Sequence, residues 1–302
     1  MHSDMKNKTE KIFAIAAALI AGIFVGLAGT TSSIVRESGF NVAQVCFTQF
    51  LLSALVTGLL SVIKFRQILS AKDFLRLIAL GMEKAIPVFT YFLSIQFMNV
   101  AAGDALQFQY VWITVLIQCI MQHILPKKWT IISAFLILGG SILGSGLMDE
   151  ILSGGTNISF VGILLSAICS VSYAVFIYAN SRTALDVNPL LRSCILSIGG
   201  FISVSLIMLF TGGFKDFDFV ASIPGGSLVG LFMCVIPFIC FAYAGPRLSG
   251  GLTAILLSSE LPAAVISGAL LKGEKITPLI VIGVIIVLGA IVLAQPRSGD
   301  CA

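Results

Sequence analysis

Long apolar stretches alternate with short polar ones along the entire chain. Ten of them are about 20 residues long, and a helix of that length, rising about 1.5 Å per residue, crosses a hydrocarbon core of about 30 Å. The pattern therefore predicts an all-α membrane protein with ten transmembrane helices. The expected spans are residues 12–35, 42–63, 74–97, 101–125, 129–147, 158–181, 189–211, 225–246, 250–271 and 277–295.

The composition favours a membrane protein over a water-soluble one. Of the 302 residues, 58% are hydrophobic and 11% are charged, against about 45–50% and about 25% in an ordinary soluble domain. The mean hydropathy is +1.05. The segments between the spans are short and carry the turn formers and charges, so none of them is long enough to hold a soluble domain. The first span lacks a small-residue cleavage site, and we expect it to be retained.

The distribution of basic residues predicts the orientation, because Lys and Arg in short loops stay on the cytoplasmic side. With the N-terminus inside, thirteen Lys and Arg residues fall in cytoplasmic segments and four in outer segments. The outer four are Arg36, Lys215, Lys272 and Lys275, and the remaining one, Lys84, lies within a span. We therefore expect a multi-pass protein of the cell membrane with both termini in the cytoplasm. The net charge of +4 follows from this distribution and does not indicate a nucleic-acid partner.

The two halves of the chain carry the same pattern. A shift of 150 residues aligns Pro87 with Pro237 and Gly139 with Gly289, and it needs no gap from the third span to the fifth. Each half has five spans, an odd number, so the second half enters the membrane from the opposite side and the repeat is inverted. Inverted repeats are typical of secondary transporters, whose halves rock about a site at the membrane midplane. The expected units are residues 1–147, an outer connecting loop at 148–157, and residues 158–302.

Polar residues within the spans recur at the helical period. Such stripes face protein or water rather than lipid. They either line a binding cavity or join helices through hydrogen bonds worth about 0.6 kcal/mol each. The stripes are Gly22, Gly26 and Thr30; Cys46, Gln49, Ser53 and Thr57; Glu83, Pro87, Tyr91 and Ser94; Gln107, Tyr110, Thr114 and Gln118; and Thr253, Glu260 and Ser267.

Charged residues on these stripes are the strongest candidates for a binding site. Glu260 lies near the membrane midplane, where an ionised side chain without a partner costs at least about 2.5–3.5 kcal/mol. Glu83 and Lys84 lie near the cytoplasmic end of their span, and as neighbours on a helix they point about 100° apart. Lys84 either extends to the interface or faces a cavity, and Glu83 either pairs with it loosely or binds substrate. We expect three prolines, Pro87, Pro237 and Pro262, to bend their helices around the cavity.

Enzyme chemistry is not expected. The only histidines are His2 and His123, so neither a metal cluster nor a Ser-His pair is available. No Gly-rich loop precedes a Lys-Ser or Lys-Thr pair, which argues against an ATP-driven pump. We therefore expect no metal and no cofactor.

The last two spans resemble those of a known transporter family. The stretch "SSELPAAVISGALLKGEKITPLIVIGVIIVLGAIVLA", residues 258–294, is similar to the penultimate and last helices of the drug/metabolite transporter superfamily, in its EamA-type branch. The matching positions are Glu260, Pro262, Gly268, Gly273, Glu274, Gly283 and Gly289. The fourth span departs from the pattern, because Trp112 stands at the position equivalent to Pro262. The ten spans and the five-plus-five repeat extend the resemblance over the whole chain.

This resemblance implies a secondary active transporter that moves a small organic metabolite by alternating access. Export of an amino acid or a related amphipathic solute is the expected activity, since an acid and a base facing one cavity suit a zwitterion. The alternatives are proton-coupled uptake or efflux of an organic cation or drug, and a receptor or structural role. The expected partners are the substrate, the lipid bilayer and a coupling proton, and either a monomer or a dimer is compatible with the sequence. The candidate substrate-binding residues are Glu260, Lys84, Glu83, Tyr91, Gln107, Tyr110, Trp112, Thr114 and Gln49.

Overall fold

The structure is a bundle of membrane-spanning helices. The computed structural model describes residues 2–39, 41–64, 69–155, 158–215 and 217–294. Within these ranges, eight helical segments are long and apolar enough to cross a membrane. Two shorter apolar helices, α6 (Lys128–Gly144) and α14 (Pro278–Ala294), match the other two expected spans. The predicted fold class, an all-α multi-span membrane protein, is confirmed.

Four of the long spans are continuous helices, one is a helix with a proline inside it, and three are interrupted. The continuous spans are α1 (His2–Glu37), α2 (Val42–Lys64), α8 (Phe160–Asn180) and α9 (Pro189–Thr211), and Pro87 lies inside α3 (Ala71–Ser94). The interrupted spans are α4 (Val100–Gln107) with α5 (Tyr110–Gln122), α10 (Phe219–Gly230) with the π-helix η1 (Leu231–Val235) and α11 (Ile236–Ala244), and α12 (Gly250–Leu257) with α13 (Glu260–Lys272). The short helix α7 (Leu147–Leu152) and the turn η2 (Gly245–Arg247) complete the described elements.

The bounds of the helices repeat along the chain. Adding 150 to the residue numbers of α4, α5 and α6 gives the bounds of α12, α13 and α14. Helices α2 and α9 have the same length of 23 residues and are offset by 147. An offset that keeps every helix start and end over three consecutive helices supports the internal repeat far more strongly than the few identical residues do. The exact unit boundaries at 147 and 158 stay a prediction.

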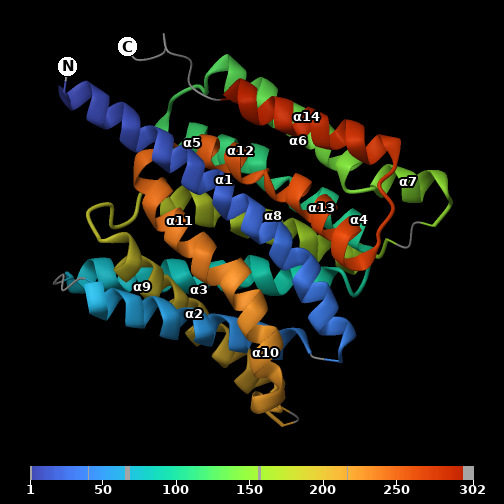
Figure 1. The fold of residues 1–302 in the computed structure, drawn as a ribbon, viewed down its shortest axis with the longest axis horizontal. Helices are drawn as coiled ribbons and strands as arrows, with labels where there is room; N and C mark the ends of the chain where they lie inside the picture. Colours follow the sequence, from blue (N-terminus) through green and yellow to red (C-terminus); the bar gives the residue numbers. More distant parts are fainter. Residues whose placement is uncertain (1, 40, 65–68, 156–157, 216, 295–302) are drawn as a thin grey trace.

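Helices also pack in pairs that the repeat relates to one another (Figure 1). Helix α2 lies against α9, and α6 lies against α14, so each of these pairs joins equivalent helices of the two halves. Helix α3 packs on α8, and the equivalent helix α11 packs on α1. Because every one of these contacts joins the first half to the second, the halves form one interlocked bundle.

The fourth and ninth spans are interrupted at equivalent places, Phe108–Gln109 and Ser258–Ser259. At both breaks the backbone tightens: Gln109 N–H donates to the Leu106 carbonyl and Ser259 N–H to the Leu256 carbonyl, each three residues back. Pro262 lacks an N–H and so promotes the second break, but Trp112 holds the equivalent position in the first. Since both spans are interrupted and only one has a proline at this position, a proline is not required for the break. Since the end of one half-helix meets the start of the next here, polar backbone groups come close to the middle of the bundle.

The beginning of α1 and the end of α14 lie at the same end of the bundle (Figure 1). If that end is cytoplasmic, Lys127 lies inside and Lys215 lies outside. Both side chains are exposed, so we expect a cysteine at residue 127 to react with a membrane-impermeant maleimide only from the cytoplasmic side. A cysteine at residue 215 should react only from the outside. Labelling of both residues from one side would contradict the orientation.

Candidate functional site

A cavity of about 280 Å³ opens between the two halves. It is lined mainly by α1, α3, α4, α8 and α13 and by the segment that joins α13 to α14, with single residues from α6, α7, η1 and α14. Lys84 lies at its deep end, and Glu150, Lys272 and Lys275 lie at its mouth. The mouth thus faces the side on which the sequence places the outer loops. A volume near the lower end of the range for small-molecule sites, about 300–1,000 Å³, suits a small solute.

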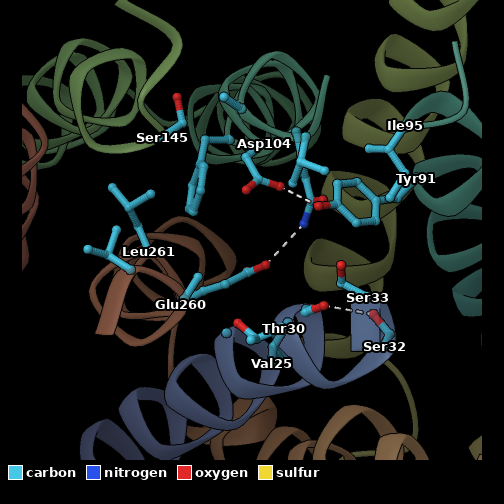
Figure 2. Close-up of a pocket in the computed structure, with 18 of the residues that line it drawn as sticks. Val25, Thr30, Ser32, Ser33, Tyr91, Ile95, Asp104, Ser145, Glu260 and Leu261 are labelled. Carbon is cyan, nitrogen blue, oxygen red and sulfur yellow. Dashed lines mark hydrogen bonds between the residues drawn. The ribbon is translucent and has the colours of Figure 1, made fainter. Parts of the chain in front are cut away.

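Glu260 is the carboxylate at the centre of the cavity (Figure 2). Its Oε1 atom accepts a hydrogen bond of 3.1 Å from Gln107 Nε2, while its Oε2 atom has no partner among the described residues. Glu260 is also the first residue of α13, directly after the break at Ser258–Ser259. The site therefore provides a carboxyl oxygen in the cavity that has no hydrogen-bond partner among the described residues.

Close contact with α1 holds the start of α13 in place. A Cβ atom at Gly26 would lie 2.9 Å from the Ala263 Cβ atom and would also strike the Glu260 carbonyl oxygen, so only glycine allows this approach. Two turns earlier on α1, the Ser259 hydroxyl donates to the Leu19 carbonyl at 2.9 Å. The predicted stripe of small residues on the first span is thus the surface that positions Glu260.

Asp104 and Tyr91 form a second polar pair in the same cavity. The Tyr91 hydroxyl, on α3, donates a hydrogen bond to Asp104 Oδ1, on α4. Figure 2 shows the carboxyl groups of Asp104 and Glu260 directed toward the same central space. Asp104 is not among the candidates predicted from the sequence, although it lies three residues before Gln107 and so falls on the same helix face.

Lys84 is buried at the deep end of the cavity, with 3% of its surface exposed. Its ammonium nitrogen lies 3.8 Å from the centre of the Tyr173 ring and 4.9 Å from that of Phe176. Within the described part of the chain, no carboxylate oxygen lies within 4.0 Å of that nitrogen. Aromatic faces attract a cation, more strongly when water is excluded. Lys84 therefore places its amino group at the cavity floor against aromatic faces and without a direct ion pair.

Glu83 lies outside the cavity lining. Its Oε1 atom accepts a hydrogen bond of 2.5 Å from the Ser172 hydroxyl on α8, and it forms no ion pair with Lys84. Both residues are candidates from the sequence, and because their side chains point about 100° apart on one helix, they reach different surroundings in the structure. Lys84 faces the cavity and Glu83 faces α8.

Of the other candidates, Tyr91 and Gln107 line the cavity and the remaining four do not. Tyr110 is fully buried below it, with its ring 4.6 Å from the Tyr173 ring. The Thr114 hydroxyl donates to the Tyr110 carbonyl at 2.7 Å. Trp112 is 40% exposed on the outer surface of the bundle, and its ring N–H donates to Gln109. Gln49 is fully buried on α2, against the backbone at Gly230.

The three prolines differ in what they do. Pro87 lines the cavity from inside α3, which continues through it, and it lies between Lys84 and Tyr91. Pro237 follows the π-helix η1 at the start of α11, and Pro262 lies in the first turn of α13. Only Pro87 therefore borders the cavity, while the other two mark places where their spans change helical form.

Opposite the mouth, the bundle is closed by a buried arginine. Arg192, at the start of α9, is fully buried and its guanidinium donates to Asn180 Oδ1 at 2.9 Å and to the Asn180 carbonyl. Asn180 Nδ2 in turn donates to the Phe241 carbonyl at 3.1 Å. These bonds tie together the ends of α8, α9 and α11. From the sequence, Arg192 is expected only to be one of the thirteen basic residues of the cytoplasmic segments.

The cavity is asymmetric although the fold repeats. Its polar residues Lys84, Asp104 and Gln107 have Cys234, Ala254 and Leu257 at the positions 150 residues further on. These three equivalents are all buried, with 1% or less of their surface exposed. Equivalent positions in the two halves therefore line a cavity in the first half and are closely packed in the second.

Comparisons with known proteins agree with this architecture. Residues 160–294 match the sequence model of the EamA-like transporter family. No curated protein matches the chain in sequence. The fold is similar to that of a protein of known crystal structure, with a TM-score of 0.74. The two sequences are 15% identical, and the match covers 95% of this chain and 98% of the other. In the described residues, no group of three or more His, Cys, Asp or Glu side chains is placed to hold a metal ion.

Proposed function

We propose that the chain is a secondary active transporter of a small organic solute, because residues 160–294 match the sequence model of the EamA-like transporter family. The cavity around Glu260 is the proposed substrate site. The family supports a transport role over an enzymatic one. The proposed location is the cell membrane, with both termini in the cytoplasm.

The observation that carries the proposal is the asymmetry between two equivalent halves. A transporter that works by alternating access needs two states of similar energy, one open to each side, and an inverted repeat provides them because each half can adopt the packing of the other. In this structure Lys84, Asp104 and Gln107 line a cavity, while their equivalents Cys234, Ala254 and Leu257 are buried and do not line it. The arrangement corresponds to an outward-open state.

The charges of the cavity favour an amino acid or a related zwitterion. Glu260 presents an acceptor oxygen without a partner, which suits a substrate ammonium group. Lys84 lies deeper in the same cavity, free of an ion pair with the described carboxylates, which suits a substrate carboxylate. Apolar walls from Val88, Phe92 and Phe108 suit a hydrophobic side chain.

An organic cation is the second candidate substrate. It is favoured by the excess of acid, since Asp104 and Glu260 face the cavity together with a single lysine in its membrane-embedded part. With all three groups ionised, that part carries one net negative charge. A cation would satisfy this charge without using Lys84.

Lys84→Gln separates the two substrate classes. We expect it to weaken transport of zwitterions by about tenfold to a hundredfold, the loss of one charge-assisted hydrogen bond of about 1.5–3 kcal/mol, and to spare simple organic cations. The measurement is uptake and efflux of a labelled panel of both classes in proteoliposomes. Lys84→Arg is the matched control, because it keeps the charge and should keep zwitterion transport. Equal loss of both classes in Lys84→Gln would instead assign Lys84 a structural role.

A further inference from the structure

We propose that Asp104, bonded to Tyr91, carries a coupling proton, while Glu260 binds the substrate amine. The proposal rests on the proposed function and divides two tasks between the two carboxylates of one cavity. A transporter that binds substrate and proton on a single carboxylate makes them compete for it. With two carboxylates, one can bind the proton while the other binds the substrate, so the two do not compete for the same oxygen atoms.

The Tyr91–Asp104 pair is not required by the fold. The positions 150 residues further on hold Phe241 and Ala254, which have no polar group to pair, and both are buried in the same helical framework. The second half therefore builds the same packing with two apolar side chains. A polar pair that occurs in only one of two equivalent places, and faces a cavity, is explained by function better than by stability.

Asp104 lies on the route from the mouth to Glu260. It is in the first turns of α4, which begins at Val100 on the side of the mouth. Gln107, one turn deeper on α4, is the residue that bonds Glu260. A proton entering from outer water therefore reaches Asp104 before it reaches Glu260.

Pro87 provides the connection between protonation and movement. It lies in α3 between Lys84 and Tyr91, and a proline within a helix frees the carbonyl four residues earlier and allows the helix to bend there. A bend at Pro87 moves Tyr91 relative to Asp104 and leaves Lys84 on the other side of the bend. The tyrosine hydroxyl stabilises the ionised carboxylate as long as it donates to it. Loss of that bond favours protonation, so the carboxyl takes a proton from water, Tyr91 keeps its own, and the proton returns to water on the other side.

Other charged and titratable groups surround this pair. Every packed element that faces Asp104 contributes at least one, except α6, whose nearby residue Ser145 does not titrate. They are Lys84 from α3, Cys169 and Tyr173 from α8, Glu150 from α7, Glu260 from α13, and Lys272, Glu274 and Lys275 at the mouth. Asp104→Asn must therefore be compared with variants of its neighbours before a pH effect is assigned to it.

The test uses two readings on the same proteoliposomes with a labelled amphipathic amino acid as the probe. One is exchange of the labelled for the unlabelled amino acid at equal pH, which needs no proton movement, and the other is accumulation driven by a pH gradient. We expect Asp104→Asn to keep exchange and to lose gradient-driven accumulation. Tyr91→Phe should shift the pH of half-maximal accumulation upward, because the ionised carboxylate has lost a donor. A merely structural role would not shift that pH.

Three results would overturn the proposal. One is gradient-driven accumulation by Asp104→Asn equal to that of the unmodified protein. Another is loss of exchange together with accumulation in folded Asp104→Asn, which would make Asp104 a substrate ligand. The third is exchange without any gradient-driven accumulation in the unmodified protein. Failure of exchange in the unmodified protein would instead refute the proposed function, so the two failures are distinguishable.

Discussion

Glu260→Gln should reduce solute transport to the level of protein-free liposomes while the protein stays folded. Glutamine keeps the size of the side chain and can still bond Gln107, but it offers no charge to a substrate ammonium group. A hydrogen bond to a charged group contributes about 1.5–3 kcal/mol, so affinity should fall about tenfold to a hundredfold, and transport measured at a solute concentration well below the Kd of the variant should approach background. The measurement is transport in proteoliposomes, with size-exclusion chromatography to check folding.

Glu83→Gln is the matched control for this variant. Glu83 is also a glutamate within a span, and it lies outside the cavity, where it accepts a hydrogen bond from Ser172. We expect Glu83→Gln to transport at close to the normal rate. Normal transport by Glu260→Gln, or equal loss in both variants, would contradict the assignment of Glu260 to the substrate site.

Gly283→Val should prevent correct packing of α14 on α6. A Cβ atom at Gly283 would lie 2.6 Å from the Gly140 carbonyl oxygen and would also strike the Gly144 backbone, neither of which is a flexible side chain. Inserting atoms into a packed contact costs about 1–3 kcal/mol, and more when only backbone can move. We expect a lower thermal midpoint and a loss of monodisperse protein in detergent.

Gly289→Val tests whether that loss is specific. Gly289 lies on the same helix, and a Cβ atom there meets nothing within 4 Å. The two variants add the same atoms to the same helix, so only the contact differs. Gly289→Val should behave as the unmodified protein does, and equal damage in both would mean that helix propensity, and not packing, is the cause.

The sequence predicts the architecture well because lipid imposes strong constraints on a chain. A membrane span must be apolar over its whole length, so the spans stand out, and the offset of 150 residues is visible in Pro87 and Pro237. The same offset relates α4, α5 and α6 to α12, α13 and α14. Helix α7 was not predicted, since six residues of mixed polarity give no periodic signal.

The candidate site was harder to predict, and the reason is the break at Phe108–Gln109. A stripe at the helical period assumes one continuous helix. The tightened turn changes which side chains face the cavity, so Gln107 lies in it while Tyr110 and Thr114, beyond the break, are buried in packing. The break could not be predicted from the sequence, because Trp112 stands where the second half has Pro262, and a tryptophan does not interrupt a helix. Asp104, on the near side of it, could have been found by extending the stripe back by one turn.

Substrate counterflow tests the central claim most directly. Proteoliposomes loaded with an unlabelled amphipathic amino acid and diluted into the labelled compound should accumulate label transiently, because a carrier that alternates between its two sides exchanges one molecule for another. Protein-free liposomes and Glu260→Gln should not. If no zwitterion or organic cation of the panel undergoes counterflow with the folded, unmodified protein, the cavity is not a transport site and the account is wrong.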